Sequence, residues 1–203
     1  MSPASKCFPN FRLMPASNPT PLEETITLVD EICRLNRFRY AVIGGIAATL
    51  YGSGRTTIDV DVIIQTELPD LEKVYSAFTK DFTPLKDDPL KFFKTFYVLP
   101  LLHKTLGSKL DISAALSEFE RRALDRGKRL NYGTASGVFC SPEDLILFKL
   151  VATRDRDLVD VRDIITRNKN RLDLTYLRNA AKEFVDVERS DVLRNLNEML
   201  DER

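Results

Sequence analysis

Apolar residues recur along the chain with two different spacings. From Leu22 to Cys33 they return every three or four residues, which predicts a helix that ends near Asn36. Further along, apolar runs are bounded by glycine, proline or acidic residues, and this pattern predicts strands separated by helices. The expected strands lie at 40–43, 57–64, 92–102 and 109–113, and the expected helices at 45–50 and 69–81.

Two helix starts are marked by capping residues. Thr20, Pro21 and Glu23 provide an N-cap, a proline at the first helical position and a capping box. Ser141 and Pro142 repeat the cap and the proline, with acidic residues in the first turn. From there to the C-terminus we expect three or four helices and no further strand.

The order of these elements predicts an α/β (α+β) fold in three parts. Residues 1–19 hold four of the ten prolines and show no apolar period, so we expect a flexible arm. Residues 20–140 alternate strands with helices and are expected to form the core. Residues 141–203 are expected to form a helical C-terminal lobe.

Two aspartates interrupt the apolar strand expected at 57–64. Asp59 and Asp61 share one face of that strand with Thr57, because side chains alternate between faces. Aspartate is disfavoured in strands, and two neighbouring carboxylates repel each other. A divalent cation removes the repulsion, and carboxylate oxygens are the ligands that Mg²⁺ prefers. The alternative is an edge strand with one solvated face.

A glycine pair precedes the aspartates by about fifteen residues. Gly44 and Gly45 lie between an expected strand and an expected helix, where backbone N–H groups can bind phosphate. The glycines could instead make only a tight turn. A phosphate-binding turn followed by a metal-binding carboxylate pair indicates chemistry on a nucleoside triphosphate.

Several further residues complete a recognisable spacing. The set is Gly44, Gly45, Ala47, Gly52, Arg55, Thr57, Asp59 and Asp61. It resembles the signature of the DNA polymerase beta-like nucleotidyltransferase superfamily, which implies a small mixed sheet with flanking helices. The resemblance is closest to the small bacterial and archaeal branch that includes the toxin components of abortive-infection toxin–antitoxin systems, and it covers roughly residues 40–165.

The resemblance implies a role for each matching residue. Asp59 and Asp61 would hold Mg²⁺, with Mn²⁺ as an alternative, and Asp111 would complete the metal site and act as the base. The acids Asp157 and Asp160 would order the nucleotide or the acceptor. The residues implied to position the triphosphate are Gly44, Gly45, Arg55, Thr57 and Lys149.

Other interpretations of these residues remain open. Asp111 could cap the following helix, and Arg55 could pair with Asp59. Lys149, Asp157 and Asp160 could form the charged face of a solvated helix. The single histidine, His103, has no evident partner, and we give it no role.

Charge and cysteine content narrow the range of functions. Thirty basic and thirty acidic residues give a net charge of zero, so no overall field attracts nucleic acid. Five basic residues cluster at 121–129, as a solvated helix end or as an acceptor-binding surface. The cysteines Cys7, Cys33 and Cys140 are too far apart for a disulfide framework or a zinc site, and we expect Cys33 and Cys140 to be buried. No apolar run approaches the length of a membrane span, so we expect a soluble, cytoplasmic protein with no membrane partner.

The sequence therefore predicts a metal-dependent nucleotidyltransferase. It would transfer a nucleoside monophosphate from a triphosphate to an acceptor hydroxyl, and the toxin-like resemblance makes RNA the first candidate acceptor and an antitoxin protein a candidate partner. The alternative is a nucleotide-binding module of the same fold that acts through a protein partner without turnover.

Overall fold

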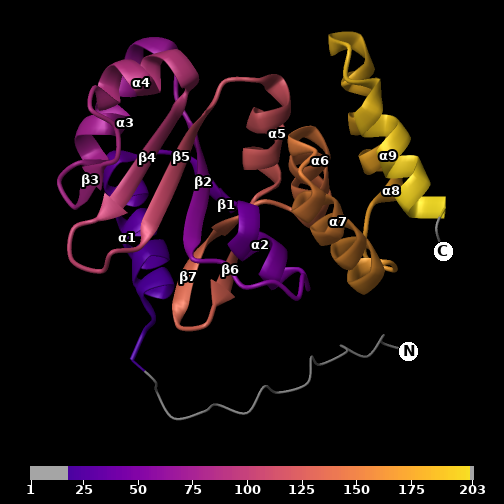
Figure 1. The fold of residues 1–203 in the computed structure, drawn as a ribbon, viewed down its shortest axis with the longest axis horizontal. Helices are drawn as coiled ribbons and strands as arrows, with labels where there is room; N and C mark the ends of the chain where they lie inside the picture. Colours follow the sequence, from indigo (N-terminus) through magenta and orange to yellow (C-terminus); the bar gives the residue numbers. More distant parts are fainter. Residues whose placement is uncertain (1–17, 202–203) are drawn as a thin grey trace, which may run out of the picture.

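The computed structural model describes residues 18–201, and these form one mixed sheet flanked by helices (Figure 1). Residues 1–17, which include Cys7 and most of the expected arm, lie outside the described residues. The strands are β1 Tyr40–Ile43, β2 Asp59–Gln65, β3 Phe82–Pro84, β4 Val98–His103, β5 Lys109–Ala115, β6 Lys128–Tyr132 and β7 Ala135–Phe139. The helices are α1 Pro21–Asn36, α2 Gly44–Leu50, α3 Leu71–Phe78, α4 Pro89–Phe96, α5 Glu118–Arg126, α6 Pro142–Ala152, α7 Asp155–Asn168, α8 Leu174–Glu183 and α9 Ser190–Asp201.

The sheet is mixed, which confirms the expected fold class. Its seven described strands run in the order β3-β4-β5-β2-β1-β7-β6. β2 pairs with β5, and β1 with β7, in parallel, whereas the other neighbours are antiparallel. This order places β2, the strand of the two aspartates, at the centre between β1 and β5.

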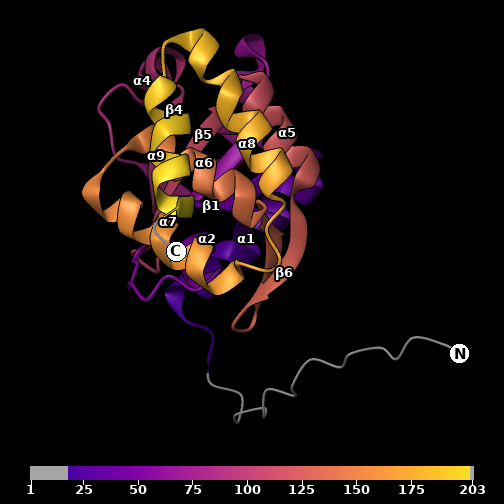
Figure 2. The ribbon, with the colours of Figure 1, turned by 90° about the vertical axis from the view of Figure 1, so that its right-hand side faces the viewer.

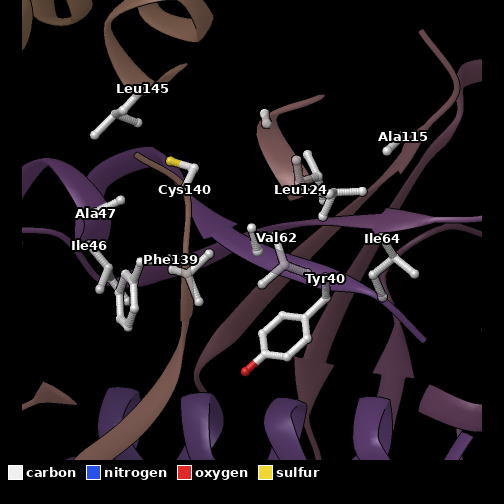
Figure 3. Packing of buried hydrophobic residues seen from close by; sticks show 14 of the residues in the cluster. Tyr40, Ile46, Ala47, Val62, Ile64, Ala115, Leu124, Phe139, Cys140 and Leu145 are labelled. Carbon is white, nitrogen blue, oxygen red and sulfur yellow. The ribbon is translucent and has the colours of Figure 1, made fainter. Parts of the chain in front are cut away.

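The alternation of side chains on β2 divides the molecule into two layers. Val60, Val62 and Ile64 are fully buried on the face that carries α1, where Tyr40 of the neighbouring strand donates a hydrogen bond to Asp30 of α1 at 2.7 Å. In Figure 3, Leu124 of α5 and Leu145 of α6 lie on the other side of the sheet from Tyr40. The aspartates therefore face away from α1.

Both helix starts expected from the sequence are confirmed. Thr20 accepts from the Glu23 N–H while the Glu23 carboxylate accepts from the Thr20 N–H, which is a complete capping box. Ser141 caps α6 by accepting from the Asp144 N–H at 3.1 Å. The C-terminal region is helical as expected, with α6–α9 and a short 3-10 turn at Val185–Val187, beside the sheet (Figure 2).

The strand expected at 92–102 is wrong in its first half. Residues Pro89–Phe96 form the helix α4, and the strand begins only at Val98. Asp88 accepts from the Lys91 N–H and Pro89 occupies the first helical position, so a cap and a proline start this helix. The apolar run hid the start because its aromatic residues also favour strands.

Three other expectations need correction. The helix expected at 69–81 is shorter, with a 3-10 turn at Leu68–Asp70 before α3. The sequence did not reveal β3 or the β6–β7 hairpin, whose turn contains Gly133 at φ 57°. The strand expected at 57–64 begins only at Asp59. Ile58 precedes the strand and is 74% exposed, so it packs into no core.

The basic residues at 121–129 are divided between α5 and β6. Arg122 pairs with Glu183, Arg126 with Glu143 and Asp144, and Arg129 with Asp30. The Arg126 guanidinium also stacks over the ring of Tyr176, 3.7 Å from its centroid. These arginines mainly join α5 and β6 to neighbouring helices, which disfavours the acceptor-binding interpretation of this cluster.

Two observations complete the fold. Cys33 and Cys140 are buried free cysteines, as expected. Among the helices at residues 18–201, none has the length and apolar character needed to span a bilayer.

Candidate functional site

A cleft of about 370 Å³ opens at the point where β1 ends and β2 and β5 begin. The turn into α2, the helix α6 and the start of α7 also line it. Of the residues predicted for the site, only Asp160 does not line this cleft. The predicted residues that line it are Gly44, Gly45, Arg55, Thr57, Asp59, Asp61, Asp111, Lys149 and Asp157. Segments more than one hundred residues apart in the chain thus meet in one place.

The strand register brings the three predicted carboxylates to one face of the sheet. Asp61 and Asp111 are direct partners in the parallel pairing of β2 with β5. Asp59 lies two residues before Asp61 and so points to the same side. The structure thereby places Asp111 beside the aspartate pair.

Mutual repulsion and burial perturb these carboxylates. Burial raises the pKa of Asp61 to about 6, the charges of Asp111 and Asp59 add to the rise, and the Gly45 N–H and Lys149 oppose it. The pKa of Asp111 is also raised, first by burial and then by the charge of Asp59. Both groups hold protons more tightly than ordinary aspartates, because each is desolvated beside like charge.

The raised pKa predicts that Asp61→Asn stabilises the cation-free protein at neutral pH. A carboxyl with a higher pKa in the folded chain than in the unfolded chain costs stability as the pH rises through that interval. The gain from asparagine should therefore be small at pH 4 and level off above pH 6, at roughly 3 kcal/mol or less. Urea unfolding with EDTA at pH 4 and at pH 7 measures the difference in stability between Asp61→Asn and the parent. Equal stability of the two proteins at pH 7 would contradict the electrostatic description.

The glycine pair allows the turn to approach the acidic face closely. Gly44 has φ 67°, and a Cβ placed on it would lie 1.9 Å from Asp61 Oδ2. A Cβ on Gly45 would lie 2.6 Å from both Arg55 Nη2 and Thr57 Oγ1. The Gly45 N–H points to Asp61 Oδ2, with an N···O distance of 3.4 Å. The glycines are required sterically, and the phosphate role of their N–H groups stays a prediction.

Arg55 lies in the loop before β2 and not on the strand. Its Nη1 is 3.2 Å from Asp160 Oδ2, so its partner is on α7 and the proposed pairing with Asp59 is not found. Its Nε is buried and lacks a hydrogen-bond partner among the described residues. Thr57 lies in the same loop beside Gly45, and its hydroxyl donates to the Asp59 carbonyl at 3.3 Å.

Lys149 is buried, so the solvated-face interpretation is wrong. Only 4% of the residue is exposed, and its Nζ lies 2.6 Å from Asp160 Oδ2 and 3.2 Å from Asp157 Oδ1. Asp157 and Asp160 are buried too, and Asp157 Oδ2 has no partner among the described residues. Lys149 lies on α6, and both acids lie on α7. The two helices pack against each other (Figure 2), which brings the three side chains together.

Asp160 connects this ion-pair network to the loop before β2. Besides Lys149 and Arg55, it accepts a hydrogen bond of 2.5 Å from the Ser53 hydroxyl. One helical turn further along, Asp163 accepts from the Gly54 N–H at 3.4 Å. α7 therefore holds the loop that carries Arg55 and Thr57 in place, and a sequence pattern could not show this role for Ser53.

The acidic face fits a divalent cation by one direct observation. Asp59 Oδ1 is buried and has no hydrogen-bond partner among the described residues, a costly arrangement for a carboxylate oxygen. Within residues 18–201, no three His, Cys, Asp or Glu side chains are close enough to form an assembled metal site. Like charges repel, so such carboxylates converge only around a cation that neutralises them. The donor set is all oxygen, which suits Mg²⁺.

The cleft contains residues that the sequence reasoning did not find. Ser113 lies two residues after Asp111 on the same strand face, a spacing that could have revealed it. Phe148 precedes Lys149 and forms an apolar part of the wall, whereas Arg154 and Arg156 are exposed at the mouth. The cleft therefore joins an acidic face, a basic wall and an apolar surface.

A larger cleft of about 720 Å³ lies near the other end of α6. Its lining includes Arg126 and Glu143, whose charged groups are paired at 3.1 Å, and it contains none of the three carboxylates on the sheet. Size alone does not make it the reactive site, because it lacks a group of carboxylates on one sheet face that could hold a cation.

Solved structures of other proteins share the fold, and two of them illustrate the likeness. One is an antigenic nucleotidyltransferase-like protein from Paracoccidioides brasiliensis, 19% identical, with a TM-score of 0.52 over 86% of this chain and 93% of that chain. The other is the antibiotic-resistance factor ANT(2″)-Ia, 14% identical, with a TM-score of 0.52 over 82% of this chain and 96% of that chain. No curated protein sequence matches the chain.

A sequence-family model assigns the chain to a family, which the fold similarity to the two distant structures cannot do alone. The model described as "Nucleotidyltransferase of unknown function (DUF6036)" matches residues 21–200, which include every strand of the sheet and the whole cleft. The superfamily expected from the residues around Gly44, Asp59 and Asp61 is thus confirmed, while the toxin branch stays a prediction. The chain belongs to the DUF6036 family of nucleotidyltransferases.

Proposed function

We propose that the protein is a Mg²⁺-dependent enzyme that transfers a nucleoside monophosphate from a nucleoside triphosphate to an acceptor hydroxyl. One observation carries this proposal: Asp59, Asp61 and Asp111 share one sheet face and line a single cleft together with the buried Lys149. That arrangement offers oxygen ligands for a cation and positive charge for phosphate in the same cleft.

The carboxylates would bind the cations and accept the proton. Asp59 and Asp61 would hold Mg²⁺, or Mn²⁺ in its place, with Asp111 completing the set. When bound, the cations would neutralise charge on the triphosphate and acidify the acceptor hydroxyl. The acceptor oxygen forms a bond to the α-phosphorus, the bond from that phosphorus to the bridging oxygen breaks, and pyrophosphate leaves. Asp111 would take the hydroxyl proton, because its carboxylate lies on the same face as the aspartates that would hold the cations.

The basic wall would position the triphosphate. Arg55 and Lys149 share the carboxylate of Asp160. This shared partner fixes both side chains at the edge of the cleft. Arg55 Nε has no partner among the described residues and can donate to a phosphate oxygen. Thr57 and the Gly44–Gly45 turn lie beside Arg55 and would contribute to the same phosphate site. Catalysis would then come mainly from positioning and charge neutralisation.

RNA is the acceptor that we propose, in a cytoplasmic enzyme that an antitoxin protein restrains. The likeness of Gly44–Asp61 to the abortive-infection branch supports this part. Expression of the parent protein in a bacterial host should then slow growth, and Asp61→Asn should not. Equal growth of both cultures at equal protein levels would remove the toxin part of the proposal and leave the transfer reaction standing.

Calorimetry and pyrophosphate release together test the reaction. We expect ATP, GTP, CTP or UTP to bind only when Mg²⁺ is present, and pyrophosphate to be released when total RNA is added. Binding without release over RNA, protein and small-molecule acceptors would favour the alternative, a nucleotide-binding module that acts through a partner. Nucleoside triphosphate binding of equal affinity with and without Mg²⁺ would contradict the metal assignment.

A further inference from the structure

A surface next to Asp111 has no role in the triphosphate site. Asp111 faces Pro100 across the β4–β5 pairing, and the Pro100 carbonyl accepts a hydrogen bond of 3.0 Å from the Leu85 N–H. Leu85 therefore lies two strand spacings, about 10 Å, from Asp111. From Leu85 the chain continues to the start of α4, which lies at the end of the sheet where β4 begins (Figure 1).

Exposed aromatic side chains gather at this edge. Phe92 and Phe96 lie one turn apart on α4, with ring centroids 4.6 Å apart, and Lys86 Nζ lies 4.9 Å from the centroid of Phe92. Phe96 is 60% exposed, Tyr97 39% and Leu85 44%. Neighbouring exposed apolar groups of this size usually mark a binding site.

The backbone fixes Tyr97 next to the active strand. Tyr97 adopts the left-handed conformation, φ 58°, at the end of α4, and its carbonyl accepts from the Ala114 N–H at 2.9 Å. Ala114 lies three residues after Asp111 on β5. This hydrogen bond joins the end of α4 to β5, three residues along the strand from Asp111.

Positive charge accompanies the aromatic rings. Lys86, Lys91 and Lys94 are exposed here, and of these Lys94 makes a 3.6 Å contact with Glu72. Lys86 directly follows Leu85, whose N–H bonds to Pro100, the residue opposite Asp111. Asp87, Asp88 and Glu72 offset these three lysines, so the exposed rings, with Lys86 over Phe92, distinguish this surface.

We propose that Leu85, Lys86, Phe92, Phe96 and Tyr97, here named the aromatic surface, bind a single-stranded RNA acceptor next to its reacting hydroxyl. The inference rests on the proposed function and specifies how its acceptor is held. Aromatic side chains bind unpaired bases by stacking, and lysines bind the phosphates between them. A duplex would fit poorly because its bases are already stacked on each other.

Fluorescence anisotropy with a labelled single-stranded RNA 12-mer tests the aromatic surface. Phe96→Ala should weaken binding about tenfold, or roughly 1.4 kcal/mol, because it removes one ring on which a base can stack. Lys86→Ala should reduce the slope of log affinity against log salt by about 0.7. The parent should bind the same sequence more weakly as a duplex. Leu35→Ala and Lys182→Ala alter an exposed leucine and an exposed lysine on α1 and α8, and both should match the parent.

Several results would contradict the proposal that the aromatic surface binds single-stranded RNA. They are parent-like RNA affinity in both Phe96→Ala and Lys86→Ala, equal or tighter binding of the duplex, or no binding of the strand by the parent. Titration of ATP with Mg²⁺ into the same proteins separates this outcome from failure of the reaction. If nucleotide binding and pyrophosphate release persist while the RNA results fail, only the surface assignment is wrong. If the parent releases no pyrophosphate with any acceptor, the proposed function fails.

Discussion

Asp59→Asn and Asp61→Asn should each reduce nucleotidyl transfer on the order of a thousandfold or more, while the protein stays folded. Each substitution removes one charge from the oxygen ligands on the sheet face but keeps the side-chain shape. Asparagine at 61 can still accept the Gly45 N–H, and burial of a neutral group is less costly than burial of a charge. Pyrophosphate release measures the first effect, and urea unfolding with EDTA measures the second.

Asp186→Asn is a matched control, because Asp186 is an exposed acid in the 3-10 turn Val185–Val187. It should retain the activity and the Mg²⁺ dependence of the parent. Parent-like turnover in either Asp59→Asn or Asp61→Asn would show that the acidic face does not bind the metal.

Lys149→Ala should destabilise the fold by roughly 3–5 kcal/mol, the cost of leaving a buried ion pair without one partner. Asp157 would lose its ion pair with Lys149, whereas Asp160 would keep Arg55 and Ser53. The double variant Lys149→Met with Asp157→Asn should recover much of the loss, because it removes the unpaired charge and fills the space. Urea unfolding of the single and double variants measures both values.

Lys182→Ala provides the comparison for this effect, since Lys182 is exposed on α8. A surface lysine makes little difference to stability, and we expect a change within about 0.5 kcal/mol. If Lys149→Ala unfolded at the same urea concentration as the parent, the buried network at Asp160 would not contribute to stability as described.

The parts of the fold predicted correctly depend on local signals. The caps at Thr20 and Ser141 act within four residues, so their sequence pattern is enough to locate a helix start. The aspartates of β2 were recognisable because charge in an apolar strand needs a compensating ligand or partner. Their coming together with Asp111 was implied by resemblance, and the parallel pairing of β2 with β5 provides the geometry.

The errors arise where tertiary contacts override local preference. Lys149 resembles a solvated helix residue in sequence, but the packing of α6 on α7 encloses it with Asp157 and Asp160. Similarly, α4 resembles a strand until Asp88 and Pro89 are recognised as its start. The partner of Arg55 is more than one hundred residues away, and no spacing rule predicts it.

Positional labelling of the nucleotide tests the central claim most directly. The protein is incubated with Mg²⁺, total RNA and cell protein, and a nucleoside triphosphate labelled at either the α- or the γ-phosphorus. Transfer at the Asp59–Asp61 site predicts that α-label appears in an acceptor, that γ-label appears in pyrophosphate, and that Asp61→Asn abolishes both. The account is contradicted if γ-label enters the acceptor, if no α-label enters either fraction, or if Asp61→Asn labels as well as the parent.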